Sequence, residues 1–497
     1  MSAPRKLLPD CILAALILLT CLLAVSGQSL WIDEANTAVK AIEPTWAGFQ
    51  RRMALERGSD LQMPLYMVAI WAWEKVAGPS EFALRALNIP LLLIALAAIR
   101  FLLDRPTLET QSFALLAIFS PMLWAYLDEA RPYVLQFLGA TLFLIALLNL
   151  ASGRGRPGHR ELLLGLIGGF LLSGASLTGV IYTFFFGLAF LALWQRREPV
   201  LRLFLRPSAM LALVGWGILM GGLAVYYAWT LKTGSRASSI GTTSPATMVF
   251  CLYELTGAAG LGPGRTTLRE AGPAALRAYL PGLGLFLLAT AAFALAGASA
   301  VRGRLVVRWP AALPFVAALT GAAAIVGLGI LMDFRVVGRH LIPVLPVFLY
   351  LATLVFTALW ISGRPLLRTA GAFYLFVLLV SSLSLRFSPR FAKDDYREAA
   401  KLASQTITGG GLCWWAADPM GAAYYGLAPV LAGESGQVFF ANGRDAAYLS
   451  RLPEPESVVL SKTDIYDATG ALRDWMKGNR FTVTKIFPAF TIWEREK

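Results

Sequence analysis

Two adjacent carboxylates, Asp33 and Glu34, stand where a long apolar segment near the amino terminus gives way to polar sequence, in the stretch WIDEA at residues 31–35. A carboxylate at such a boundary is partly desolvated, which raises its basicity, so one of the two could take a proton from an attacking hydroxyl group. Neighbouring positions on a helix point in different directions, so the pair cannot serve one reacting centre as acid and base together. One would be the base, and the other would orient or bind. The structural alternative is an acidic first turn that favours the helix dipole.

A second polar group heads a later apolar segment in the stretch DEARPY, with Asp128, Glu129 and Arg131 followed by Pro132. Proline is tolerated in the first turn of a helix. A charge near the middle of a bilayer costs about 2.5–3.5 kcal/mol, so this group would be expensive to bury without a purpose. At the membrane surface the cost is smaller, and Glu129 could simply neutralise Arg131. A functional and a structural role are both consistent with this group.

Membrane-spanning helices are the elements that must position these residues. The chain has 497 residues, 57% of them hydrophobic and 15% charged, with a mean hydropathy of +0.61. A soluble domain is about half apolar and a quarter charged, so a purely soluble globule is excluded. Apolar runs long enough for a bilayer core of about 30 Å recur from the first segment onwards. They predict a polytopic α-helical membrane protein with about eleven spans, at residues 8–27, 82–103, 112–127, 133–151, 161–176, 178–194, 209–230, 279–299, 311–331, 341–360 and 366–386.

The basic residues indicate which side of the membrane each loop occupies. The net charge is +14, yet residues 387–497 hold 13 basic and 13 acidic side chains, so the whole excess lies in the membrane part. Because this excess is spread over short loops, nucleic acid is excluded as a partner, and the positive-inside rule makes these loops and the amino terminus cytoplasmic. The loop residues are Arg5, Lys6, Arg100, Arg105, Arg154, Arg156, Arg160, Arg196, Arg197, Arg202, Arg206, Arg302, Arg304, Arg308, Arg364 and Arg368.

The opposite, external side then receives the two acidic groups and the rest of the chain's unusual polar residues. Within the first external loop we predict surface helices at 33–42, 45–57 and 64–77, the last too short to span. The domains predicted are a transmembrane catalytic domain at 1–386, with external helices at 28–78 and an external loop at 231–278, and an external α/β domain at 387–497. In the last domain we expect helices at 395–406, 422–425 and 472–477, with strands at 412–416, 438–440, 458–460 and within 481–493.

Five motifs, in their order along the chain, resemble those of the C-type glycosyltransferase superfamily. They are WIDEA (31–35), DLQMPLY (60–66), AGPSEFALRAL (77–87), DEARPY (128–133) and RHLIPVLP (339–346). Within the superfamily, the chain is most similar to the branch of protein O-mannosyltransferases and lipid A aminoarabinose transferases. The resemblance is best over the first 150 residues, looser over the later spans, and limited to architecture in the C-terminal domain.

The resemblance implies an inverting glycosyltransferase that takes a sugar from a polyprenyl-phosphate carrier and gives it to an external or membrane-embedded acceptor. The acceptor could be lipid A or lipopolysaccharide core, another glycan or a protein, and the motifs do not name the sugar. In those families the aspartate of the acidic pair in the first loop is the catalytic base. This role corresponds to Asp33 here, with Glu34 as a supporting or acceptor-orienting residue.

A lipid phosphate as leaving group requires fixed cations at the membrane surface, whereas a glycosidase requires two opposed carboxyl groups. We therefore assign Arg131 first, then Arg335, Arg339 and Arg85, to binding of the donor phosphate. Arg335 and Arg339 are four residues apart, so on a helix they would repel each other unless an anion lay between them. The structural alternatives are snorkelling towards lipid headgroups for this pair and a place at the start of a span for Arg85.

Sugar or acceptor binding is assigned to polar residues of the same motifs, namely Asp60, Tyr66, Glu129, Tyr133 and His340. The chain departs from the aminoarabinose transferases before Pro64, where Gln62 and Met63 stand in place of a lysine, so one phosphate contact of that family is missing. No metal site is predicted, because His340 is the only external histidine and a metal would depend on carboxylates such as Asp33, Glu34 or Asp60. A divalent metal stays open as a cofactor.

Two other functions stay open. A transporter or flippase of a lipid-linked glycan would need charged residues along a path through the membrane. An inactive scaffold would bind partners through its C-terminal domain. The stretch GAAGLGPGR at 257–265 lacks the lysine of a Walker loop, so we expect the hinge of an external lid or a plain flexible loop, with Arg265 solvated. A composition rich in Ala, Gly, Leu and Arg suggests a bacterium, and hence an inner-membrane protein whose C-terminal domain is periplasmic.

Overall fold

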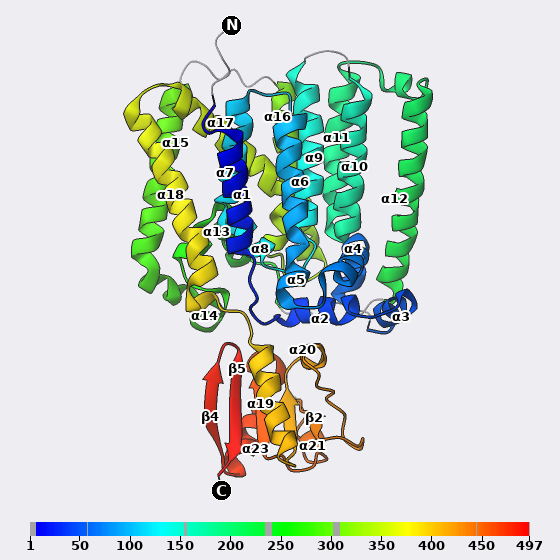
Figure 1. The fold of residues 1–497 in the computed structure, drawn as a ribbon, viewed down its shortest axis with the longest axis vertical. Helices are drawn as coiled ribbons and strands as arrows, with labels where there is room; N and C mark the ends of the chain where they lie inside the picture. Colours follow the sequence, from blue (N-terminus) through cyan, green and yellow to red (C-terminus); the bar gives the residue numbers. More distant parts are fainter. Residues whose placement is uncertain are drawn as a thin grey trace. The chain divides into compact units, whose positions relative to one another are not determined.

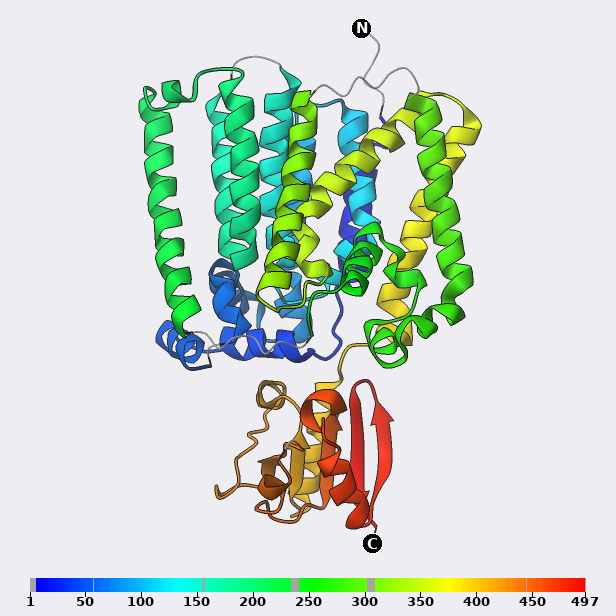
Figure 2. The ribbon, with the colours of Figure 1, turned by 180° about the vertical axis from the view of Figure 1, so that it is seen from behind.

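The structure is a computed structural model that describes residues 6–56, 58–153, 157–233, 241–301, 309–443 and 445–496 (Figure 1, Figure 2). Contacts between residues divide the chain into two compact units. The first unit comprises residues 1–25, 53–70 and 85–391, and the second comprises residues 26–52, 71–84 and 392–497. Some arginines of the predicted cytoplasmic loops lie outside the described residues, namely Arg5, Arg154, Arg156, Arg302, Arg304 and Arg308.

The first unit is a bundle of long apolar helices, as expected for a polytopic membrane protein. Among the described residues, eight helical stretches are long and apolar enough to cross a membrane. Their helices are α6 (Asn88–Leu102, continuing from α5, Glu81–Ala86), α9 (Tyr133–Ser152), α11 (Leu177–Gln195), α12 (Pro207–Thr233), α15 (Leu280–Val301), α16 (Trp309–Leu331), α17 (Leu345–Ile361) and α18 (Pro365–Phe387). The spans predicted at 8–27 and 161–176 correspond to the shorter helices α1 (Asp10–Ala24, 15 residues) and α10 (His159–Ala175, 17 residues). The count of eleven spans stays a prediction.

The span predicted at 112–127 is not one continuous helix. The structure has two helices there, α7 (Thr107–Ile118) and α8 (Pro121–Leu127), bent by 62° at the break between them. Pro121 has no N–H to continue the ladder of α7, and it holds Ser120 in an extended conformation with φ −72° and ψ 116°. The proline thus ends one helix and begins the next, and the pair raises the number of candidate spans to nine at most.

The central helix of the bundle is α9, which is buried along almost its whole length. It packs closely on α10, because Gly139 faces the backbone of the other helix: a Cβ at Gly139 would lie 2.8 Å from the amide nitrogen of Leu172. By contrast α12 stands at the edge of the bundle and is largely exposed (Figure 2). The ends of α6, α11 and α17 that lead into arginine-bearing turns lie at the same end of this unit (Figure 1).

The opposite end of the first unit is built from short helices that bring polar residues to the helix ends. These are η1 (Ser59–Gln62), α13 (Pro245–Thr256), η3 (Ala258–Leu261), α14 (Arg265–Ala271), η4 (Gly272–Tyr279), η5 (Gly338–Val344) and η6 (Pro389–Phe391). Another short helix, η2 (Val200–Leu203), precedes α12. The loop predicted at 231–278 is therefore largely helical where it is described, and Gly257 ends α13 with φ +97°, a conformation that favours glycine.

The three surface helices predicted in the first loop are present as α2 (Ile32–Ala41), α3 (Trp46–Glu56) and α4 (Pro64–Ala77). The division into units falls within α3, α4 and α5. In the second unit, the Trp71 indole N–H donates to the Glu43 carbonyl oxygen at 2.9 Å, and Trp71 also packs edge-on against Trp46. These contacts fasten the link between α2 and α3, and the start of α3, to α4.

The C-terminal part of the second unit is a five-stranded sheet covered by helices, as predicted. The strands are β1 (Cys413–Ala416), β2 (Val438–Phe440), β3 (Ser457–Ser461), β4 (Phe481–Phe487) and β5 (Phe490–Arg495), in the order β2-β1-β3-β5-β4. The first three are parallel, whereas β5 pairs antiparallel with both β3 and β4. One core lies between the sheet and α19 (Tyr396–Thr408) with α20 (Pro419–Tyr424), and the other lies against α21 (Ala446–Leu449), α22 (Thr463–Tyr466) and α23 (Ala471–Gly478). Neighbouring Trp414 and Trp415 fill opposite cores, as the alternation of a strand requires.

Candidate functional site

The acidic pair occupies the first turn of α2, and its two carboxylates have different surroundings. Glu34 is fully buried, and its Oε2 accepts a hydrogen bond from the Trp31 amide at 3.4 Å, which caps the helix. Asp33 is partly exposed. Of the two, Asp33 is therefore the carboxylate that another molecule can reach.

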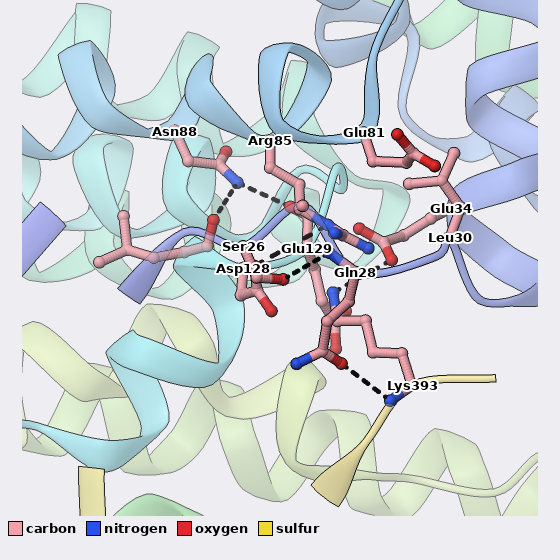
Figure 3. Close-up of polar contacts among 12 residues, drawn as sticks. Ser26, Gln28, Leu30, Glu34, Glu81, Arg85, Asn88, Asp128, Glu129 and Lys393 are labelled. Atoms are coloured by element: carbon pink, nitrogen blue, oxygen red, sulfur yellow. Dashed lines mark hydrogen bonds and ion pairs between the residues drawn. The ribbon is translucent and has the colours of Figure 1, made fainter. Parts of the chain in front are cut away.

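The buried charge of Glu34 is compensated from the C-terminal segment. Lys393 Nζ lies 3.1 Å from Glu34 Oε2, and the lysine side chain is only 14% exposed (Figure 3). The backbone N–H of the same lysine donates to Gln28 Oε1 at 3.1 Å. A buried carboxylate is costly without a compensating partner, and the ammonium group of Lys393 is one such partner for Glu34.

A third carboxylate, Asp418, also lies next to α2. Its Oδ1 accepts hydrogen bonds from the amides of Met420 and Gly421, at 2.9 and 3.1 Å, and lies 3.4 Å from Asn36 Nδ2. Burial raises the pKa of Asp418, and the nearby negative charge of Asp33 raises it further, while the two amides and Lys462 oppose the rise.

The raised pKa of Asp418 predicts a pH-dependent gain in stability for Asp418→Asn. The native state holds the proton of Asp418 more tightly than the unfolded state, so its stabilising contribution is complete below the ordinary value of 3.8 and is lost as the pH rises through the native pKa. Asparagine caps a helix as well as aspartate does. Thermal unfolding should therefore give equal stabilities at acidic pH and a variant that is more stable at neutral pH, by on the order of 1 kcal/mol.

The matched control for this prediction is Asp445→Asn. Asp445 is exposed and caps α21 through the Tyr448 amide at 3.1 Å, so it shares the capping role of Asp418 without its burial. We expect this variant to follow the unmodified protein at every pH. A gain at neutral pH in the control, or a loss of stability in Asp418→Asn, would contradict the explanation.

In the first unit, the DEARPY turn is held by two buried side chains, one from α5 and one from the start of α6. Arg85 is fully buried, with its Nε 3.9 Å from Asp128 Oδ1, a distance that makes an ion pair but not a hydrogen bond. Asn88 Nδ2 donates to the carbonyl oxygen of Glu129 at 2.6 Å (Figure 3). Arg85 therefore interacts with a residue of the same turn that carries Arg131.

Arg131 and Asp60, predicted for different roles, are brought together. Arg131 Nη1 lies 2.6 Å from Asp60 Oδ1, and the two side chains are 7% and 1% exposed. Close by in sequence, the ring of Tyr133 packs edge-on against that of Tyr126, with centroids 4.6 Å apart. Tyr66 is fully buried.

Arg335 and Arg339 do not share a helix. Arg335 lies in a stretch without regular secondary structure and is exposed, whereas Arg339 follows in η5 and is partly buried. The argument that two helical arginines four residues apart need an anion between them therefore does not apply. His340 Nδ1 accepts a hydrogen bond from the Val337 amide at 3.1 Å, which uses one ring nitrogen within its own loop.

An arginine that was expected to be solvated is paired. The Arg265 side chain is half exposed, yet its Nε and Nη2 donate to Glu254 Oε1 at 2.9 and 2.6 Å, and Nη2 lies 3.4 Å from the hydroxyl of Tyr126. The electrostatic pull of Glu254 raises the pKa of Arg265. Glu254 is buried beside Gly338, so its carboxylate requires a cationic partner. Neither the sequence distance nor any motif links Glu254 to Arg265.

The glycine-rich stretch before Arg265 is fastened to α18 by one side chain. Ser381 Oγ donates to the Gly257 carbonyl at 2.6 Å and accepts from the Gly260 amide at 3.1 Å. A Cβ on Gly260 would come within 1.9 Å of the Ser381 carbonyl oxygen, so only glycine fits there. Gly260 is required because its backbone lies close to that of Ser381, and no bound phosphate is needed to explain it.

The predicted site residues thus fall into two sets. Asp33 and Glu34 belong to the second unit; Asp60, Tyr66, Arg85, Glu129, Arg131, Tyr133, Arg335, Arg339 and His340 belong to the first. Within the described part of the chain, no three His, Cys, Asp or Glu side chains are arranged to hold a metal ion.

Comparison with known proteins identifies the fold. No family model and no curated protein sequence matches the chain. Its structure is similar to two crystal structures of ArnT from Cupriavidus metallidurans, the apo state (TM-score 0.55) and the complex with undecaprenyl phosphate (TM-score 0.52), each at 12% identity over 97% of both chains. It is also similar to the arabinofuranosyltransferase AftD from Mycobacteria (TM-score 0.50, 14% identity), covering 100% of this chain and 41% of AftD. The expected resemblance is confirmed at the level of the fold, which the chain shares with these structures, and the chain is a multi-pass membrane protein.

Proposed function

We propose that this chain is an inverting glycosyltransferase that moves a sugar from a polyprenyl-phosphate carrier to a hydroxyl group of an acceptor. The observation that carries the proposal is the contrast within the acidic pair. Asp33 is accessible, whereas Glu34 is buried and neutralised by Lys393, in a chain that shares its fold with membrane glycosyltransferases. An accessible carboxylate on a helix that is held in place can come within hydrogen-bond reach of an acceptor hydroxyl, which a general base requires.

In the proposed reaction, the Asp33 carboxylate accepts the proton of the acceptor hydroxyl as its oxygen attacks the anomeric carbon. The new carbon–oxygen bond forms on the face opposite the leaving group, which inverts the configuration. The bond between the anomeric carbon and the phosphate oxygen breaks, and its electron pair stays on the polyprenyl phosphate. No protonated carboxylic acid is required, because a phosphate leaves as a stable anion when cations stabilise it.

Arginines of the first unit are proposed to supply those cations. The assignment of Arg131, Arg335, Arg339 and Arg85 is kept, and Arg265 is added because its guanidinium is half exposed. Arginine presents five N–H donors, so one bound carboxylate leaves donors for a phosphate. Glu254 and Asp60 would then orient Arg265 and Arg131 without occupying all of their N–H donors.

The sugar or the acceptor is proposed to contact residues of the same unit, namely Asp60, Tyr66, Glu129, Tyr133 and His340. Tyr133 is the strongest of these, because its ring packs against Tyr126, whose hydroxyl in turn lies next to Arg265. The proposed location is a bacterial inner membrane, with the arginine-bearing helix ends in the cytoplasm and the C-terminal domain in the periplasm. The positive-inside rule supports this orientation.

A transfer assay in proteoliposomes tests the function. The full-length protein would be supplied with polyprenyl-phosphate pentoses and hexoses and with lipid A, glycan or peptide acceptors, and free polyprenyl phosphate would be quantified by mass spectrometry. We expect one donor and acceptor pair to release free polyprenyl phosphate together with a glycosylated product of inverted configuration. Movement of the intact donor between leaflets without its consumption would instead indicate a transporter.

A further inference from the structure

The second unit places the first turn of α2 at the carboxyl ends of the parallel strands of the C-terminal sheet. Asp418 follows β1, Lys462 follows β3, and β1 lies between β2 and β3. In doubly wound sheets such an edge is where ligands usually bind. Here α2 packs against α20 at that edge, with Asn36 Nδ2 3.4 Å from Asp418.

The residue immediately before Asp33 belongs to the core of the C-terminal domain. Ile32 packs against the apolar cluster that contains Tyr396 and Trp415, both fully buried. The residue immediately after Asp33 is Glu34, whose buried carboxylate is paired with Lys393. The C-terminal domain therefore holds the chain on both sides of Asp33.

The segment that leads into α2 is bound by the same domain. Arg397 donates from Nη2 to the Gly27 carbonyl at 2.7 Å and from its amide to Ser29 Oγ at 3.1 Å. The Leu30 amide donates to the hydroxyl of Tyr425 at 3.0 Å. Gly27, Ser29 and Leu30 of the lead-in thus each have a hydrogen-bond partner in the C-terminal domain.

Lys393 joins these two sets of contacts. Its backbone N–H binds the side chain of Gln28 at the start of the lead-in, and its ammonium group binds Glu34 inside the helix (Figure 3). One residue therefore fixes both ends of a segment of seven residues, 28–34, that includes Asp33. Lys393 and Glu34 are 359 positions apart in the sequence, so their pair is a tertiary contact and not part of the local cap of α2.

We propose that the C-terminal domain is a positioning element of the active site, and that Lys393 is the positioning residue that presents Asp33 to the acceptor. The inference rests on the proposed function in one respect only, that Asp33 is the base. Without the ammonium group, the buried charge of Glu34 has lost a neutralising partner, and the first turn of α2 opens so that water can reach the carboxylate. Asp33 then moves with the turn, and a displacement of about 1 Å is enough to lower the rate about 10²-fold.

The test compares Lys393→Met with Lys393→Arg in the full-length, reconstituted protein. In Lys393→Met we expect kcat to fall about 10²-fold at an unchanged KM for the donor, and amide exchange in α2 to rise at least about tenfold, with α23 unaffected. Lys393→Arg retains the charge and should stay within about threefold of the unmodified protein in both measurements. The matched control is Lys485→Met, which breaks an exposed pair with Glu398 at 2.6 Å in the same unit and should change neither.

A double variant keeps the test informative if Lys393→Met folds poorly. Lys393→Met combined with Glu34→Gln removes both charges of this pair, so protection of α2 against exchange should return to within about threefold of the unmodified protein. Native kcat or native exchange in Lys393→Met, or a double variant that stays unprotected, would overturn the inference. Exchange is measured without substrate, so an absence of transfer by the unmodified protein would refute the proposed function while leaving the test of Lys393 intact.

Discussion

Asp33→Asn is expected to lower the rate of sugar transfer by about 10²–10⁴-fold while the protein folds and binds its donor as before. The amide has the shape of the carboxylate but cannot accept the acceptor's proton, and that range is the usual contribution of a positioned general base. Asp33 is partly exposed, so water can reach the substituted side chain. Single-turnover transfer, measured with saturating donor, isolates the chemical step from product release.

The matched control for Asp33→Asn is Glu43→Gln in the same surface loop. Glu43 Oε1 pairs with Arg52 Nε at 2.7 Å, and both side chains are partly exposed. The control should transfer sugar at the native rate, because a pair at the surface contributes little. Native transfer by Asp33→Asn would refute the assignment of Asp33 as the base. Loss of donor binding in that variant would instead assign Asp33 a role in substrate binding.

The glutamate beside Asp33 shows how far local sequence can predict a site. Adjacent acids in a first helical turn could be recognised, and so could the impossibility of both facing one substrate. Which of the two is buried depends on Lys393, a residue 359 positions away. The structure, not the pattern, therefore identifies Asp33 as the accessible member and Glu34 as the buried one.

Elements with strong local signals could be predicted from the sequence almost to the residue. The acidic first turn of α2 and the short apolar runs of β1 to β3 are examples, since each follows from periodicity and capping. The break between α7 and α8 was missed although Pro121 marks it, because the apolar run continues through the proline. Hydropathy measures burial in lipid and does not register a bend of 62° inside an apolar stretch.

The pairing of charges was the least predictable feature. Arg265 reads as a solvated loop residue and Arg131 as a free phosphate ligand, yet each binds a carboxylate from a distant segment, Glu254 and Asp60. Such pairs form because burying one charge requires the other, and this depends on the tertiary fold alone. A basic residue at the end of a span is therefore evidence for an anion, but the anion can be part of the protein.

Asp60→Asn is expected to destabilise the protein by about 3–5 kcal/mol, the usual result of removing one partner from a buried ion pair. The Arg131 side chain is 7% exposed and Asp60 is 1% exposed, so water cannot readily replace the lost carboxylate. Thermal unfolding in detergent would measure the loss. The control is Asp104→Asn, since Asp104 pairs with Arg160 at 3.2 Å and the two side chains are 43% and 41% exposed, and it should cost about 1 kcal/mol or less. A loss for Asp60→Asn no larger than that of the control would show that the pair is not important for stability.

The double variant Asp60→Leu with Arg131→Met then separates the two roles proposed for Arg131. Replacing both members of a buried pair by apolar residues of similar volume is often neutral, so most of the stability should return. If Arg131 also binds the donor phosphate, transfer stays low and the KM for the donor rises in this stable protein, because a cation at the leaving group has been removed. If transfer returns together with stability, Arg131 is a structural residue, and Arg265, with its half-exposed guanidinium, becomes the first arginine to test as the phosphate ligand.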